Sequence, residues 1–135
     1  MVNFFSPLPS IGDILWCHFP QAPQLGTPGP KPRPAIVVAV SSSTNEVAVI
    51  YGTSQKTNKI YATEFVMDPS DPGFAISGLS FRTKFDCAAR VKLPFNEDWF
   101  AIAPKWPSLS PLPKLGTLHP SYMPAITSAA SNVTP

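Results

Sequence analysis

The residues of this chain that could do chemistry are few, and one of them is held in place by its neighbours. Arg33 stands between Pro32 and Pro34, at the start of an apolar run that ends at Val40. Each proline fixes its own φ and pushes the preceding residue towards extended backbone, so Arg33 has little freedom. Two interpretations are open: the guanidinium is positioned at the edge of a cleft to hold an anion, or it only solubilises the start of a strand.

A lysine and a carboxylate form a second candidate group. Within residues 83–87, Lys84 and Asp86 are two positions apart and would share one face of a strand. Such a pair could act as acid and base in proton transfer, or both residues could be solvated surface charges. His18 is open in the same way, because it could be catalytic or simply half-buried and bonded to a backbone carbonyl.

Polar residues follow the apolar run that ends at Tyr51. Hydroxyl, amide and ammonium groups gather here, from Thr53, Ser54, Gln55 and Lys56. They could bond phosphate oxygens, although the same residue types are common in turns. The sequence has no Cys and His at metal-ligand spacing, no phosphate-binding glycine loop and no nucleophile elbow. We therefore expect neither a metal ion nor a cofactor.

The composition indicates which elements must position these residues. A chain of 135 residues that is 44% hydrophobic can form one core. Eighteen prolines and only 13% charged residues favour short strands and rigid loops, while a net charge of +2 does not by itself indicate a nucleic-acid partner. The pattern predicts a mainly β chain with strands at residues 14–19, 36–40, 46–51, 60–66, 83–87 and 90–93. Its β-branched residues predict that the strand at 36–40 is buried on both faces or crosses the core of a small barrel.

Three regions differ in composition. We expect a β domain over residues 1–102, a Pro-rich extended segment over 103–120, and a helix and tail over 121–135, where apolar residues recur at helical spacing. Cys17 and Cys87 lie in apolar surroundings and fit reduced thiols of a core. No stretch is long enough to span a bilayer and the start lacks the basic region of a signal peptide, so we expect a cytoplasmic protein.

Several of these residues form motifs in a fixed order. Gly12-Asp13-Ile14-Leu15-Trp16 comes first, then Arg33-Pro34-Ala35-Ile36-Val37-Val38, Gly52-Thr53-Ser54-Gln55, Gly78-Leu79 and Thr83-Lys84-Phe85-Asp86. In order and spacing they resemble the MazF/PemK family of toxins from bacterial toxin-antitoxin pairs, over roughly residues 11 to 95. The resemblance implies an SH3-like small β-barrel with a short C-terminal helix, a homodimer, a cognate antitoxin, and a metal-independent endoribonuclease acting on single-stranded RNA. Cleavage through the ribose 2′-OH would leave a 2′,3′-cyclic phosphate.

The resemblance also implies roles for individual residues. Arg33 and Thr53 match the arginine and hydroxyl that hold the phosphate, and Lys84 and Asp86 fall where relatives carry the groups of proton transfer. The RNA would be contacted by Lys31, Ser54, Gln55, Lys56 and Phe85. One departure is clear, because the family's loop before Arg-Pro commonly carries an acidic residue or histidine and residues 23–32 have none. Either this chain lacks that group, or His18 substitutes for it.

Two hypotheses follow for the function. In the first the chain is an RNA-cleaving toxin, and in the second it is a barrel of the same descent that only binds a protein or nucleic acid. Convergence of Arg33, Thr53, Lys84 and Asp86 on one cleft would favour the enzyme, whereas dispersal would favour the binding module.

Overall fold

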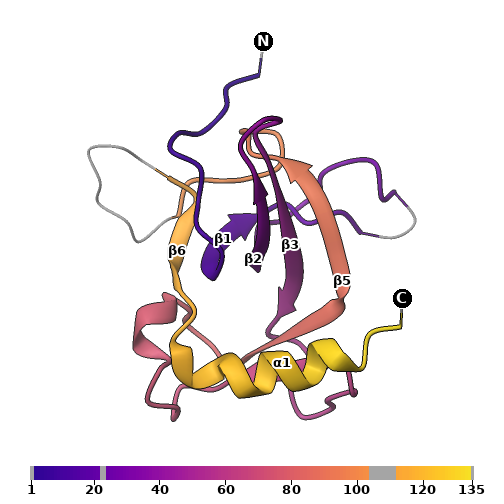
Figure 1. The fold of residues 1–135 in the computed structure, drawn as a ribbon, viewed down its shortest axis with the longest axis vertical. Helices are drawn as coiled ribbons and strands as arrows, with labels where there is room; N and C mark the ends of the chain where they lie inside the picture. Colours follow the sequence, from indigo (N-terminus) through magenta and orange to yellow (C-terminus); the bar gives the residue numbers. More distant parts are fainter. Residues whose placement is uncertain (1, 22–23, 104–111, 135) are drawn as a thin grey trace.

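A computed structural model describes residues 2–21, 24–103 and 112–134, and its main feature is one curled antiparallel sheet (Figure 1). The sheet has six strands in the spatial order β4-β5-β3-β2-β1-β6. Their bounds are Asp13–Cys17 (β1), Arg33–Ser41 (β2), Glu46–Thr53 (β3), Glu64–Met67 (β4), Thr83–Pro94 (β5) and Lys114–Thr117 (β6). Two short 3₁₀ turns, Ala75–Ser77 (η1) and Pro120–Tyr122 (η2), and one helix, Met123–Ser131 (α1), complete the described elements.

The central strands are buried on both faces. Side chains on a strand alternate between its two faces, and consecutive residues are buried over 13–15 of β1 and 35–37 of β2, so both faces are buried there. Leu15 and Val37 belong to one hydrophobic cluster, whereas their sequence neighbours Ile14 and Ile36 belong to a second cluster. The prediction that the strand around 36–40 is buried on both faces is confirmed for residues 35–37.

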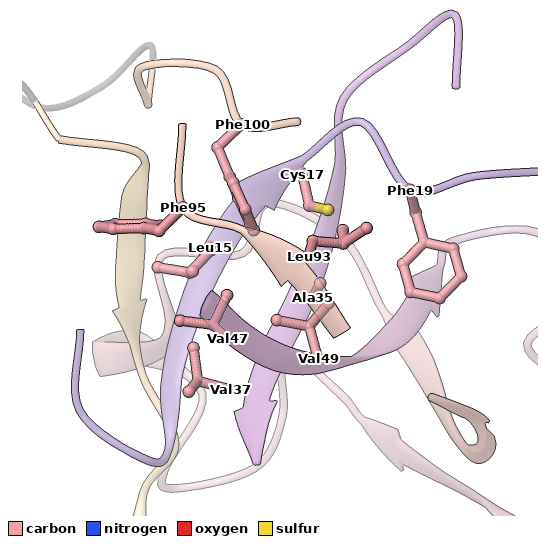
Figure 2. Packing of buried hydrophobic residues seen from close by; sticks show 10 residues of the cluster. All are labelled: Leu15, Cys17, Phe19, Ala35, Val37, Val47, Val49, Leu93, Phe95 and Phe100. Atoms are coloured by element: carbon pink, nitrogen blue, oxygen red, sulfur yellow. The ribbon is translucent and has the colours of Figure 1, made fainter. Parts of the chain in front are cut away.

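The first cluster lies inside the curl of the sheet. The cluster takes side chains from β1, β2, β3 and β5, together with phenylalanines from the connecting segments. Figure 2 shows these side chains gathered together. Phe95 and Phe100 pack edge to face with 5.4 Å between ring centroids, and Phe19 lies 5.0 Å from the ring of Tyr51. Aromatic rings therefore cover the part of the core that the short strands leave open.

The helix covers the second cluster. α1 contacts β4 and β5, and in Figure 1 it crosses the lower end of the sheet. Ala129 from α1 and Tyr122 from η2 are buried against Phe65 and Phe85. The Tyr122 hydroxyl donates a hydrogen bond of 2.8 Å to Asp71, which ties the helix to the connection before η1. Burial raises the pKa of Tyr122, so this hydroxyl keeps its proton and remains a donor.

The predicted fold class is confirmed: the chain is mainly β, with a curled antiparallel sheet and a short C-terminal helix. Three details differ from the sequence-based strands. The runs at 83–87 and 90–93 are one strand, β5, and the strand predicted at 60–66 begins only at Glu64. Residues 114–117 of the predicted extended segment form β6, which pairs with β1, and residues 104–111 of that segment lie outside the described residues.

Cys17 has an exposed fraction of 0% and packs in the first cluster, and both cysteines are free. Burial raises the pKa of each thiol, with the Asp86 charge adding to the effect at Cys87. Neither sulfur is thus a ready nucleophile. No helix in the described part of the chain is long and apolar enough to cross a membrane.

Candidate functional site

The strand register brings three predicted site residues to one end of neighbouring strands. Ala35 of β2 lies opposite Tyr51 of β3, so Arg33 and Thr53 are each two residues further along at the same end. Thr53 in turn lies opposite Lys84 of β5. Arg33, Thr53 and Lys84 therefore occupy adjacent strands in a row, a placement set by backbone pairing alone.

A pocket of about 230 Å³ opens at this end of the sheet. Most of its lining comes from three places: the start of β2 with Arg33, Thr53 and Ser54 at the end of β3, and the connection from η1 to β5, while β1 and β6 contribute one residue each. We call this cavity the Arg33 pocket, and its lining is Trp16, Pro32, Arg33, Pro34, Thr53, Ser54, Gly78, Leu79, Ser80, Phe81, Thr83 and Leu115. Its chemistry is one guanidinium and several hydroxyls set among apolar side chains.

Arg33 is the charged residue in the lining of the pocket. It is the first residue of β2 and is only partly exposed, and its Nε is buried without a hydrogen-bond partner among the described residues. A buried donor without a partner is costly, and in native structures it calls for an explanation such as a bound ion or a functional role. The interpretation of Arg33 as an anion-holding group gains from this, because the alternative required a solvated side chain.

The residues after Thr53 form a turn. The Thr53 hydroxyl accepts a 3.1 Å hydrogen bond from the backbone N–H of Gln55, and Lys56 has a positive φ of 52°. Ser54, Gln55 and Lys56 are exposed, and of these three only Ser54 lines the pocket. The turn interpretation of this stretch is confirmed, and two of its hydroxyl-bearing residues, Thr53 and Ser54, also line the pocket.

Lys84 does not line the Arg33 pocket. Its Nζ donates to the carbonyl of Lys59 at 2.8 Å and lies 3.4 Å from Oε1 of Glu64, and both side chains of this ion pair are about nine-tenths buried. The ammonium also lies 5.7 Å from the ring centroid of Tyr61. Of the two interpretations, the solvated surface lysine is therefore excluded, because Lys59 and Glu64 hold the ammonium.

Asp86 also lies outside the pocket lining. Its Oδ1 accepts hydrogen bonds from the Thr63 hydroxyl at 2.8 Å and the Ala88 backbone N–H at 2.9 Å. Lys84 and Asp86 thus have separate partners. The structure brings Arg33 and Thr53 together in one cavity and leaves this pair of titratable groups beside it.

The remaining predicted residues lie in different surroundings. His18 Nδ1 is 3.0 Å from the carbonyl of Gly29, which matches the backbone-bonded interpretation, and the residue is absent from the pocket lining. Lys31 is exposed, two residues before Arg33. Phe85 is fully buried, with its ring 5.7 Å from that of Phe65, so the predicted RNA contact by this ring is not supported. The buried Phe85 ring packs against Gly52, which has no side chain; a Cβ at residue 52 would lie 2.4 Å from the ring.

Sequence reasoning missed part of the pocket. Phe81 lines it and was not named from the sequence, whereas Leu79 and Thr83 line it and were named only as parts of motifs. The position of Phe81 depends on how the connection from η1 to β5 meets β6, where Gly78 lies against Leu115. A Gly-Leu pair before a strand gave no chemical signal. A phenylalanine next to an arginine, Phe81-Arg82, was the one available hint. Among the described residues, no group of three or more His, Cys, Asp and Glu side chains could hold a metal ion.

No family model matches the chain, and no curated protein matches it. The solved structures that share its fold include two endoribonucleases. One, described as an endoribonuclease from a mycobacterial species, has a TM-score of 0.56 and 17% sequence identity, covering 96% of this chain and 92% of its own. The other, a mycobacterial endoribonuclease in complex with its cognate antitoxin, has a TM-score of 0.54 and 18% identity and covers 91% of each chain. At these identities the likeness establishes the fold, and at that level it agrees with the MazF/PemK resemblance.

Proposed function

We propose that this chain is an endoribonuclease of the toxin-antitoxin type that cuts single-stranded RNA at the Arg33 pocket. The observation that carries the proposal is the unpartnered Nε of Arg33, buried beside a pocket that the hydroxyl-bearing residues Thr53 and Ser54 also line. A guanidinium and hydroxyls are the groups that proteins use to hold phosphate oxygens. The two structural neighbours described as endoribonucleases support the same reaction class.

The reaction follows from the chemistry of the phosphodiester. The ribose 2′ oxygen attacks phosphorus and loses its proton to a base, and the bond to the 5′ oxygen breaks as that oxygen gains a proton from an acid. The products are a 2′,3′-cyclic phosphate and a 5′-hydroxyl, so no water is consumed in this step, and the proposal assigns no part of it to a metal ion. Negative charge grows on the phosphoryl oxygens in the transition state, where Arg33 and Thr53 stabilise it.

The acid and base are assigned to Lys84 and Asp86, as the resemblance implies. In the absence of RNA, both side chains already have protein partners. Lys84 forms an ion pair with Glu64, and Asp86 accepts a hydrogen bond from Thr63. Their roles require an exchange of these partners for the RNA when it binds. Thr53 lies opposite Lys84 in the sheet, so the backbones that carry these two residues are one strand spacing apart.

The partners follow from the same proposal. A cognate antitoxin would bind this chain, as one binds the neighbour in the second complex. The proposal also includes a homodimer. It includes a cytoplasmic location, since a toxin that cuts RNA acts where its RNA is. With a net charge of only +2, attraction of RNA depends on local groups such as Arg33 and Lys31.

One observation favours the second candidate function, a barrel that binds RNA or protein without cutting. None of the titratable acid or base candidates Lys84, Asp86 and His18 is in the lining of the Arg33 pocket. A pocket with a guanidinium and hydroxyls alone can bind a phosphate but has no group of suitable pKa for proton transfer.

A cleavage assay on mixed single-stranded RNA in chelator separates the two functions. Arg33→Ala should abolish cleavage, and Arg90→Ala provides the matched control because Arg90 is an exposed arginine of β5 outside the pocket lining. Loss in both variants would point to general electrostatics. RNA binding by the wild type with no cleavage under any condition would establish the binding module instead.

A further inference from the structure

Phe81 is an exposed aromatic side chain at the Arg33 pocket. Its exposed fraction is 70%, although it lines a cavity with other apolar residues such as Leu79 and Trp16. Single exposed apolar residues are normal on protein surfaces. This ring differs because it shares its cavity with a guanidinium whose Nε has no partner in the described part of the chain.

The backbone that carries this ring is anchored on its C-terminal side. The Thr83 hydroxyl donates a 2.8 Å hydrogen bond to the Phe81 carbonyl. Arg82 donates to Asp68 at 2.9 Å and to the carbonyl of Thr57 at 3.3 Å. The ring is therefore presented from a held segment, so a planar ligand could use it at a small cost in ordering.

We propose that Phe81 is a stacking platform for one unpaired base of the RNA whose phosphate is held by Arg33, an inference that rests on the proposed function. A nucleotide combines a flat base with an anionic phosphate, and the pocket combines a flat exposed ring with a guanidinium. In a duplex both faces of a base are already stacked on neighbouring bases, so only a base in a single strand has a face free to stack on the ring. Because every base has a flat face, Phe81 selects single strands and sets affinity without reading sequence.

The test measures binding by fluorescence anisotropy with single-stranded oligonucleotides of 2′-deoxyribose, which cannot be cut through a 2′-OH. Phe81→Ala should weaken binding by roughly 5- to 100-fold, the range found when one base–aromatic stack is removed. Phe81→Trp and Phe81→Tyr should restore it, whereas Phe81→Leu should behave as Phe81→Ala does. Phe4→Ala is the matched control, because Phe4 is 52% exposed and lies outside the pocket lining.

Salt and strandedness distinguish stacking from charge. Phe81→Ala should leave the slope of log affinity against log salt unchanged, while Arg33→Ala should reduce that slope by about 1. Wild type and Phe81→Ala should bind a duplex of the same sequence equally. Full affinity in Phe81→Leu would overturn the proposal, because an apolar side chain without a ring would then suffice.

The same experiments distinguish failure of the stacking role of Phe81 from failure of the proposed ribonuclease function. If Arg33→Ala abolishes RNA cleavage and Phe81→Ala changes neither binding nor cleavage, stacking is overturned and the ribonuclease stands. If the wild type neither binds nor cuts RNA, both fall. If Phe81→Ala changes only the oligomeric state in light scattering, the ring serves a contact with a second copy of the chain and the stacking role is wrong.

Discussion

Arg33 and Arg82 show how differently two arginines of one chain can be placed. Arg82 is paired with Asp68 at 2.9 Å. The Nε of Arg33 is instead buried, and no described residue accepts a hydrogen bond from it. Such a donor costs about 1–3 kcal/mol of stability. A group retained at that cost fits a ligand site better than a structural one.

Replacing the Arg33 side chain should consequently not destabilise the fold. We expect Arg33→Met to melt at the wild-type temperature or a few degrees higher, because the methionine removes the unpaired donor and keeps much of the volume. The same variant should lose RNA cleavage. Thermal melting and a cleavage assay on one preparation check both parts, and a marked fall in melting temperature would show that Arg33 is structural.

Lys84 should behave in the opposite way. Its ion pair with Glu64 is almost fully buried, and removing one partner of such a pair costs about 3–5 kcal/mol. Lys84→Met should therefore lower the midpoint of denaturant unfolding strongly. Lys84→Met combined with Glu64→Gln should recover part of the loss, because no unpaired charge remains.

That double variant also tests the catalytic role of Lys84. If Lys84 is the acid, the stable double variant should cut RNA roughly 100-fold or more slowly than the wild type. Wild-type cleavage by the double variant would show that the lysine serves only the ion pair. The single variant cannot answer this, because unfolding alone would remove its activity.

At the scale of elements, the sequence predicts the strands that carry their own pattern. β2 and β3 read as strands because β-branched residues recur and turn residues bound them. β6 could not be predicted in this way, since Lys114–Thr117 is short, contains a glycine and follows many prolines. It is a strand because β1 offers it an edge for pairing, which is a tertiary effect.

The residues of the candidate site also fall into two groups, those that a local sequence pattern predicts and those that depend on tertiary contacts. Arg33 and Thr53 could be predicted because their motifs fix them at strand ends. The partners of Lys84 could not, because Glu64 is 20 residues away in sequence and Lys59 contributes a backbone carbonyl. Phe81 was missed because the pocket forms only when the connection from η1 to β5 folds against β6.

Gly78 controls how that connection meets β6. Its φ is +72°, and a Cβ would lie 1.9 Å from the Leu115 carbonyl oxygen. Gly78→Ala should destabilise the protein by about 1–3 kcal/mol and weaken RNA binding, because both residues line the Arg33 pocket.

Gly26→Ala is the control for this prediction, because a Cβ there meets nothing within 4 Å. It should unfold at the wild-type denaturant concentration. Equal midpoints for Gly78→Ala and Gly26→Ala would show that the close approach at Leu115 is relieved without cost.

For the whole molecule, the exposed apolar side chains predict association. Several large ones are at least half exposed, namely Phe4, Ile11, Leu25, Tyr61, Phe81, Ile102 and Met123. With little net charge to keep copies apart, we expect a homodimer. Light scattering at micromolar concentration should give twice the chain mass of 14.6 kDa, and a clean monomer would contradict a groove shared between two subunits.

If the Arg33 pocket cuts RNA by using the 2′-OH of the RNA as the nucleophile, the chemical groups at the ends of the RNA fragments show it most directly. One oligonucleotide is prepared with either ribose or deoxyribose at the cut site, incubated in chelator, and its fragments are weighed by mass spectrometry. We predict a 2′,3′-cyclic phosphate and a 5′-hydroxyl from the ribose substrate, with the deoxyribose substrate bound but intact. Cleavage of the deoxyribose substrate, or a 5′-phosphate that forms only when Mg²⁺ is returned, would contradict the claim.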